Sequence, residues 1–123
     1  MKKMLIAAGS TVVTDELAEE FQNEYNVYRC SDGAAALTMI QDIKPDILII
    51  SLSLSHTSGL EVLQLATHKP ETTIALTNFI SDYIVHACET AGVCALIRSP
   101  CSIDCIKRHL NKDNQLNPGT TTT

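Results

Sequence analysis

Short apolar runs and longer amphipathic segments alternate along the whole chain. The apolar runs are typical of buried β-strands, and they fall at residues 4–7, 25–30, 47–50, 73–76 and 94–97. Ile47–Ile50 is apolar at every position, as expected for a central parallel strand that is covered on both faces. The run around Val27 alternates polar and apolar residues, which indicates a strand near the edge of a sheet.

The segments between these runs carry apolar residues at helical spacing. The clearest helix is predicted at residues 79–91, with Ile80, Tyr83, Ile84, Ala87, Cys88 and Ala91 on one stripe and Gly92 as the helix-ending residue. Similar stripes predict helices at residues 11–24, 36–43, 59–67 and 103–110. Strands that alternate with helices favour a parallel sheet with right-handed crossovers. We therefore predict an α/β fold in three layers, with five helices and a sheet of five parallel strands covered on both faces.

The length of 123 residues suits a single domain with one core. We assign residues 1–112 to this domain. Residues 113–123 are too polar and too rich in Asn, Gly and Thr to pack a core, so we expect a disordered tail or the start of a linker there. The Thr-rich end suggests that an output domain follows beyond residue 123.

The charge pattern excludes some function classes. The formal net charge of -5 argues against direct nucleic-acid binding by this domain, because phosphate binding needs clustered Lys and Arg. Lys2 and Lys3 precede an apolar run, but Met4–Ala8 is far too short for a signal peptide or a membrane span. We expect a cytoplasmic protein that binds no membrane.

The five cysteines do not form a recognisable metal or disulfide framework. They are Cys30, Cys88, Cys94, Cys101 and Cys105, an odd number without zinc-binding spacing. Cys101 and Cys105 are four residues apart and could share a helix face. We expect small, largely buried thiols that stay reduced.

Several motifs occur in an order that points to one family. They are Lys44–Ile50, Leu60–Leu63 after the nine residues Ser51–Gly59, Ala75–Thr77, Ala91–Val93 and Ile97–Pro100. Together with Asp32-Gly33, this set resembles the CheY-like receiver domains of bacterial two-component response regulators over about residues 2–112. The resemblance implies the three-layer flavodoxin-like (CheY-like) fold, in which the five parallel strands have the order 2-1-3-4-5. The interval from Ser51 to Thr77 is about two residues short for this family, so we predict that the helix inside it is trimmed.

The resemblance also implies where the phosphorylation site of a receiver would lie. Such domains place an acidic pair after the first strand and an acceptor aspartate after the third, which together hold Mg²⁺. A hydroxyl residue after the fourth strand and a lysine after the fifth contact the phosphoryl group. In this sequence the acidic pair falls on Ala8 and Gly9, the acceptor on Ser51, the hydroxyl on Thr77 and the lysine on Ser99.

Four of these five positions have therefore lost their chemistry, and only Thr77 is retained. Mg²⁺ requires hard oxygen ligands, usually carboxylates, and none of the replaced side chains supplies one. Without the cation and the lysine, nothing neutralises the charge of a transferring phosphoryl group. We expect no catalytic residues, no Mg²⁺ or other cofactor, and no enzymatic activity.

The leading hypothesis is a pseudo-receiver that acts as a phosphorylation-independent protein-interaction or dimerisation module, in two-component-type signalling or transcription regulation. Its partner would be another protein or a second copy. The expected interaction face combines the fourth helix, fifth strand and fifth helix, with Val85, His86, Glu89, Ile97, Arg98, Lys107 and Arg108. Two alternatives stay open: a ligand-sensing domain that uses the vacated phosphorylation pocket, and a flavodoxin-like enzyme or carrier, which lacks a Gly-rich phosphate loop here.

Overall fold

The computed structural model describes residues 1–54, 56–99 and 102–115, and within these ranges it leaves out the side chains of residues 11–13 and 111–115. Strands and helices alternate as predicted. In chain order they are β1 (Lys3–Ala7), α1 (Thr11–Phe21), β2 (Asn26–Cys30), α2 (Gly33–Ile43), β3 (Ile47–Ser51), α3 (Gly59–Leu65), β4 (Thr72–Thr77), α4 (Asp82–Ala91), β5 (Ala95–Arg98) and α5 (Ile103–Gln115).

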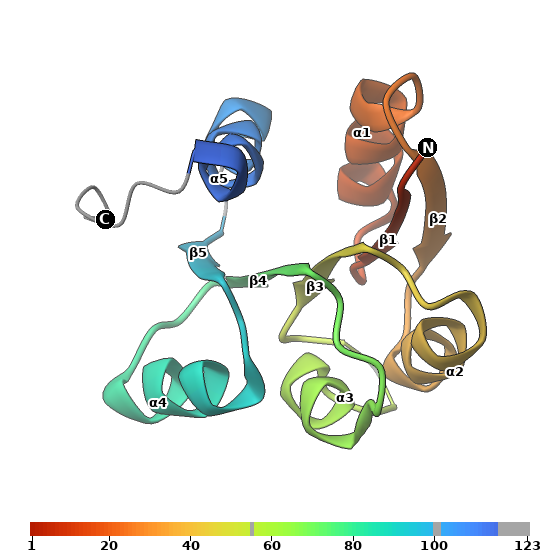
Figure 1. Ribbon diagram of the computed structural model, residues 1–123. Helices are drawn as coiled ribbons and strands as arrows, with labels where there is room; N and C mark the ends of the chain where they lie inside the picture. Colours follow the sequence, from red (N-terminus) through yellow and green to blue (C-terminus); the bar gives the residue numbers. More distant parts are fainter. Residues whose placement is uncertain (55, 100–101, 116–123) are drawn as a thin grey trace.

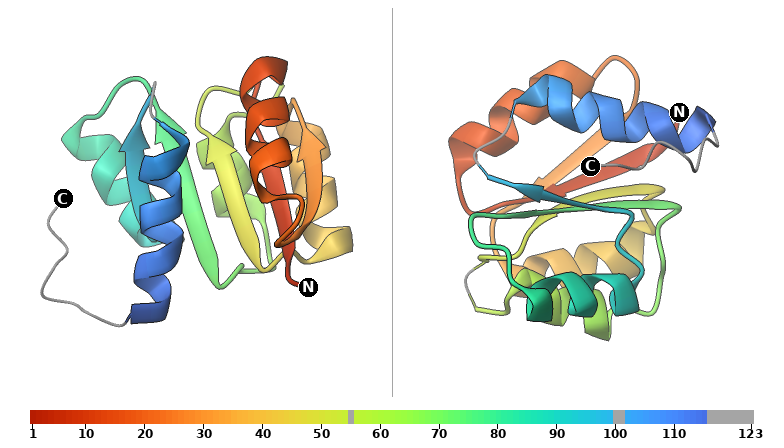
Figure 2. Two further views of the ribbon diagram at one scale, coloured as in Figure 1. Left: turned by 90° about the horizontal axis from the view of Figure 1, so that it is seen from above. Right: turned by 90° about the vertical axis from the view of Figure 1, so that its left-hand side faces the viewer.

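The five strands form one parallel sheet in the order β2-β1-β3-β4-β5, which confirms the predicted topology (Figure 1). Strands β1 and β3 pair with Met4 opposite Ile47, and β3 and β4 pair with Leu48 opposite Thr73. Helices α1 and α5 cover one face of the sheet, and α2, α3 and α4 cover the other (Figures 1 and 2).

Two apolar clusters lie between the sheet and its helical layers, because successive side chains of a strand point to opposite faces. Ile6, Ile49 and Ile74 pack against Phe21 of α1 and Ile106 of α5. The second cluster lies on the other face and includes Leu5, Leu48, Ile50, Ile40 of α2 and Val62 of α3. Burial of each such side chain contributes about 1.5–3 kcal/mol to folding, so this double core is the main source of stability.

Side chains with cap chemistry fix where the helices on the second face begin and end. Asp32 accepts a hydrogen bond from the N–H of Ala35 (2.8 Å) at the start of α2, and Ser58 accepts one from the N–H of Glu61 (3.2 Å) in α3. Gly92 ends α4 in the left-handed conformation, at φ 87°, as the sequence predicted.

Helix α4 differs from the prediction at its amino end. Ser81 caps the helix with its side chain, so α4 starts three residues later than the predicted residue 79. The predicted apolar stripe is therefore only half correct. Ala87 and Cys88 are buried, whereas Ile80 precedes the helix and Tyr83 is 71% exposed.

The predicted boundaries differ from the structure at two further helix ends. Helix α3 ends at Leu65, two residues before the predicted end at residue 67. Helix α5 continues to Gln115, five residues beyond the predicted helix end at residue 110. Residues 116–123, most of the predicted tail, lie outside the described residues, so the tail and the output domain stay predictions. Within the described ranges, no helix combines the length and the apolar character needed to cross a bilayer.

Candidate functional site

A hollow of about 320 Å³ opens at the carboxyl ends of the central strands. This is the edge at which open parallel sheets commonly bind ligands. The described residues that line it come from the ends of β1, β3, β4 and β5: Ala8, Gly9, Ser10, Ser51, Ser53, Leu76 and Ser99. Four of the five predicted pocket positions therefore meet here, namely Ala8, Gly9, Ser51 and Ser99.

Backbone hydrogen bonds beyond the regular ladder hold these strand ends together. The N–H of Ala8 donates to the carbonyl of Cys30 (3.1 Å), and the N–H of Ser99 donates to the carbonyl of Thr77 (2.7 Å). These bonds hold Ala8 and Ser99 directly after the ends of β1 and β5, beside the hollow.

At the fifth predicted position, the side chain of Thr77 forms hydrogen bonds within its own loop. Its hydroxyl donates to the carbonyl of Phe79 (2.9 Å) and accepts from the N–H of Phe79 (3.2 Å), and Thr77 is not among the residues that line the hollow. The retained hydroxyl thus has a local structural role as an ST-type turn at the start of the β4–α4 connection.

The donor set of the hollow does not fit Mg²⁺. Its described polar side chains are serine hydroxyls, and Ser51 Oγ accepts a hydrogen bond from the N–H of Ser53 (3.2 Å). No carboxylate lies among the described lining residues, and within the described chain no group of three His, Cys, Asp or Glu side chains could hold a metal ion. A cation there would lose hydration without gaining a charged ligand.

The predicted interaction face is only partly continuous. Val85, His86, Glu89, Arg98 and Arg108 are exposed on α4, β5 and α5. The side chain of Ile97 is buried in the cluster beneath α1 and α5, so it cannot contribute to a surface. The ammonium of Lys107 forms an ion pair with Glu20 of α1, and this salt bridge turns Lys107 toward α1, on the far side of α5 from the predicted face.

Four exposed apolar side chains lie in and just before the first turn of α4, and only one of them, Val85, belongs to the predicted face. They are Phe79, Ile80, Tyr83 and Val85, and we call them the 79–85 patch. Phe79 is 63% exposed and Ile80 40% exposed, and the patch holds four of the six large apolar side chains that are exposed in the described chain. The missed signal was Ser81, because a capping serine places the preceding apolar residues outside the helix.

Two of the described thiols, Cys30 and Cys88, are held in the protonated form by their surroundings. Burial, with a smaller contribution from the charge of Asp32, raises the pKa of the Cys30 thiol to about 11. Burial also raises the pKa of Cys88. Both thiols are therefore protonated near pH 7. Cys101 lies outside the described residues, so its pairing with Cys105 stays untested.

The sequence matches no protein-family model and no curated protein. Solved structures nevertheless superpose on nearly the whole chain. The chemotaxis protein CheY4 of Vibrio cholerae is 20% identical, with a TM-score of 0.82 over 91% of this chain and 98% of that chain. A DNA-binding response regulator of the LuxR family from Staphylococcus aureus is 18% identical, with a TM-score of 0.81 over 93% of this chain and 99% of that chain.

This chain has the receiver fold. At such identities the likeness establishes the architecture, and function depends on the residues of the site. A response regulator protein from Burkholderia pseudomallei that carries a phosphorylated aspartic acid, a calcium ion and citrate shares the fold as well, with 16% identity, a TM-score of 0.77, and coverage of 100% of this chain and 77% of that chain. In the present chain, the described residues that line the hollow are serine, alanine, glycine and leucine.

Proposed function

We propose that this protein is a receiver-type module that signals through protein contact, without phosphorylation. The observation that carries the proposal is the hollow itself, in which Ala8, Gly9, Ser51 and Ser99 line the edge where receivers conduct their chemistry. A serine hydroxyl without a base is a weak nucleophile, and transfer to it would need charge neutralisation that the lining side chains do not supply. The protein would therefore be no enzyme, and it would need no Mg²⁺.

The 79–85 patch supports contact as the mode of action. Exposed apolar residues that occur singly need no explanation, but several of them within one short segment favour an interaction surface. Phe79 and Tyr83 are large, rigid aromatic side chains of the kind that dominates binding energy at interfaces. Polar Thr77 fixes the connection that presents them, through its two hydrogen bonds to Phe79.

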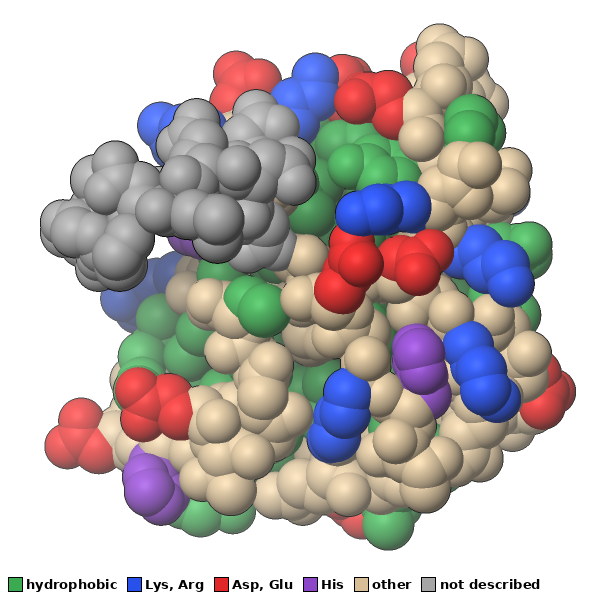
Figure 3. All heavy atoms as spheres, in the orientation of Figure 1, with side chains coloured by type: hydrophobic (Ala, Val, Ile, Leu, Met, Phe, Trp, Pro, Cys, Tyr) green, Lys and Arg blue, Asp and Glu red, His purple; other side chains and the backbone are tan. Residues whose placement is uncertain are grey.

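The partner that we propose is a second copy of this chain. Exposed Asp82 and Glu89 lie on α4, while exposed Arg98 and Arg108 lie on β5 and α5. In a two-fold dimer, the acidic residues of each copy would face the basic residues of the other copy. The same ion pairs would therefore form twice, on either side of an apolar centre. Charges of both signs are also interspersed on the face seen in Figure 3, which does not resemble the continuous basic surface of a nucleic-acid-binding domain.

We expect the purified protein to form a dimer at micromolar concentrations. Tyr83→Lys should raise the dissociation constant of the dimer roughly thirtyfold, because it removes a central aromatic contact of about 2 kcal/mol. Sedimentation velocity over a range of concentrations measures this directly. Addition of Mg²⁺ and a small acyl phosphate should leave the association unchanged.

Leu65→Lys is the matched control, because Leu65 of α3 is also exposed and apolar but lies outside the patch. It should dimerise like the wild-type protein. A wild-type protein that stays monomeric throughout, or a dimer that Tyr83→Lys and Leu65→Lys weaken equally, would exclude the 79–85 patch as a self-association surface.

The relative in Staphylococcus aureus is a DNA-binding response regulator, and by analogy we place this module in two-component-type signalling or transcription regulation, with DNA contacts made outside this domain. The alternative of a ligand sensor in the vacated hollow has less support. Its described lining offers no charged group to anchor a ligand.

A further inference from the structure

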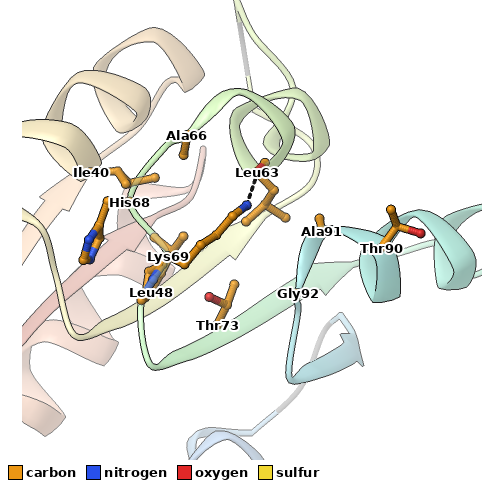
Figure 4. A pocket seen from close by; sticks show the side chains of 11 residues that line it. Ile40, Leu48, Leu63, Ala66, His68, Lys69, Thr73, Thr90, Ala91 and Gly92 are labelled. Atoms are coloured by element: carbon orange, nitrogen blue, oxygen red, sulfur yellow. Dashed lines mark hydrogen bonds between the residues drawn. The ribbon is translucent and has the colours of Figure 1, made fainter.

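A second cavity lies at the other end of the strands from the hollow, near the amino ends of β3 and β4. It measures about 240 Å³ and lies beneath the carboxyl ends of α3 and α4 (Figure 4). The residues that line it are Ile40, Leu48, Leu63, Ala66, His68, Lys69, Pro70, Thr73, Thr90, Ala91 and Gly92. None of these positions belongs to the hollow or to the 79–85 patch.

Small residues at two helix ends create this space. Helix α3 ends early and is followed by Ala66, and α4 ends at Ala91 before Gly92. These residues do not fill the volume between the helices, while Leu48 and Leu63 provide a buried apolar wall. The cavity lies where helix α3, which has only seven residues, ends.

Thr73 gives the cavity a polar group that lacks a partner. Its side chain is only 4% exposed, and its hydroxyl has no hydrogen-bond partner among the described residues. The other buried polar residues of the described chain, Thr14, Thr72 and Thr77, all have one. Because no fully enclosed polar atom there is unsatisfied, the Thr73 hydroxyl must open onto the cavity. A hydroxyl that opens onto a cavity is free to hydrogen-bond a group bound there.

Lys69 extends over the same cavity (Figure 4). Its ammonium donates one hydrogen bond to the carbonyl of Leu63 (3.3 Å), near the carboxyl end of α3, and an ammonium has three N–H donors. No carboxylate pairs with Lys69 among the described residues. The ring of His68, hydrogen-bonded to the carbonyl of Pro45 (2.8 Å), anchors the loop that carries Lys69.

We propose that this cavity binds a small monocarboxylate with an aliphatic or aromatic body. The apolar wall of Leu48 and Leu63 takes the body, the Lys69 ammonium takes the carboxylate, and the Thr73 hydroxyl supplies a further donor. Size supports this class, since a dry cavity of about 150 Å³ already holds benzene. The proposal is independent of the proposed function, because it concerns neither the hollow nor dimerisation.

Titration of the isotope-labelled protein with sodium benzoate, followed through backbone amide NMR shifts, tests the site. We expect saturable shifts at the amides of residues 63–73 and 90–92, with a Kd in roughly the millimolar range expected of so small a ligand. Benzyl alcohol, which has the same ring without the charge, should bind at least about fivefold more weakly, because it cannot form the ion pair with Lys69.

Two variants separate ligand binding from folding. Lys69→Met keeps the aliphatic stem but removes the charge, and it should remove the preference for benzoate over benzyl alcohol. Thr73→Val is nearly isosteric and should weaken benzoate by roughly fivefold through loss of one hydrogen bond. The matched control is Lys44→Met, since Lys44 likewise donates to a carbonyl near a helix end, that of Gln41 (3.1 Å), but lies outside the cavity.

Absence of saturable shifts around the cavity in the folded wild-type protein would overturn the proposal, and the Thr73 hydroxyl would then be satisfied by water alone. Binding that Lys69→Met, Thr73→Val and Lys44→Met leave equally strong would overturn it as well.

Discussion

Substitution of Gly33 by alanine is expected to lower the free energy of unfolding by about 3 kcal/mol or more. A Cβ atom at position 33 would lie 1.7 Å from the carbonyl oxygen of Thr57 and 2.5 Å from its carbonyl carbon. Both are backbone atoms, so no rotamer change can relieve the clash. The first turn of α2 and the β3–α3 loop would have to separate. Urea unfolding followed by circular dichroism measures the effect.

Gly9→Ala is the matched control, because a Cβ atom there meets nothing closer than the Ser53 carbonyl oxygen, at 3.8 Å. This variant should unfold within about 0.5 kcal/mol of the wild-type protein. Equal stability of Gly33→Ala and Gly9→Ala would show that the β3–α3 loop does not pack against α2 as described.

The second large effect is expected when carboxylates are returned to the hollow. A variant with Ala8→Asp, Gly9→Asp and Ser51→Asp should be less stable than the wild-type protein in the absence of divalent cations, because three carboxylates within one small site repel one another. Mg²⁺ should restore its stability, by about 1.4 kcal/mol when the free cation is at ten times its Kd. The wild-type protein should show no Mg²⁺-dependent change in Tm.

Ala8→Asn, Gly9→Asn and Ser51→Asn together form the control, which reproduces the shape of the aspartates without their charge. This control should not respond to Mg²⁺. Thermal unfolding of the three proteins, with and without the cation, distinguishes a charge effect from a packing effect. If Mg²⁺ stabilised the wild-type protein as much as the triple aspartate variant, the hollow would hold the cation by groups other than carboxylates.

Much of the fold could be predicted from local sequence patterns. The apolar run Ile47–Ile50 identified the central strand, and Gly92 identified the end of α4, since both signals depend only on neighbouring residues. The parallel sheet followed from the alternation of strands and helices, whereas the strand order followed from the resemblance to receiver domains, because alternation allows other orders.

The start of α4 was predicted wrongly because two local signals compete there. Apolar spacing extended the helix back to Ile80, whereas the Ser81 cap begins it later. The sequence alone does not show which of the two signals determines the start of the helix. In the structure the Ser81 cap does, and Phe79 and Ile80 are exposed in the β4–α4 connection. The 79–85 patch could therefore not be inferred from periodicity alone.

The location of the hollow could be predicted from the sequence, but the hydrogen bonds of the individual side chains could not. Ala8, Ser51 and Ser99 were located through the resemblance to receiver domains, whose site residues follow the first, third and fifth strands, and the three residues do line one hollow. The hydroxyl of Thr77, in contrast, bonds to Phe79 of its own loop, which depends on the geometry of the turn. The cavity near Thr73 depends on the packing of α3 against α4, and residue spacing carries no information about such contacts.

The central claim is that the hollow lacks the charge to support phosphorylation, and intact-mass spectrometry tests it most directly. The purified wild-type protein is incubated with Mg²⁺ and a small acyl phosphate, and its mass is measured before and after. We expect the mass to remain unchanged. A gain of one phosphoryl group that maps to Ser51 or to another residue lining the hollow would contradict the account.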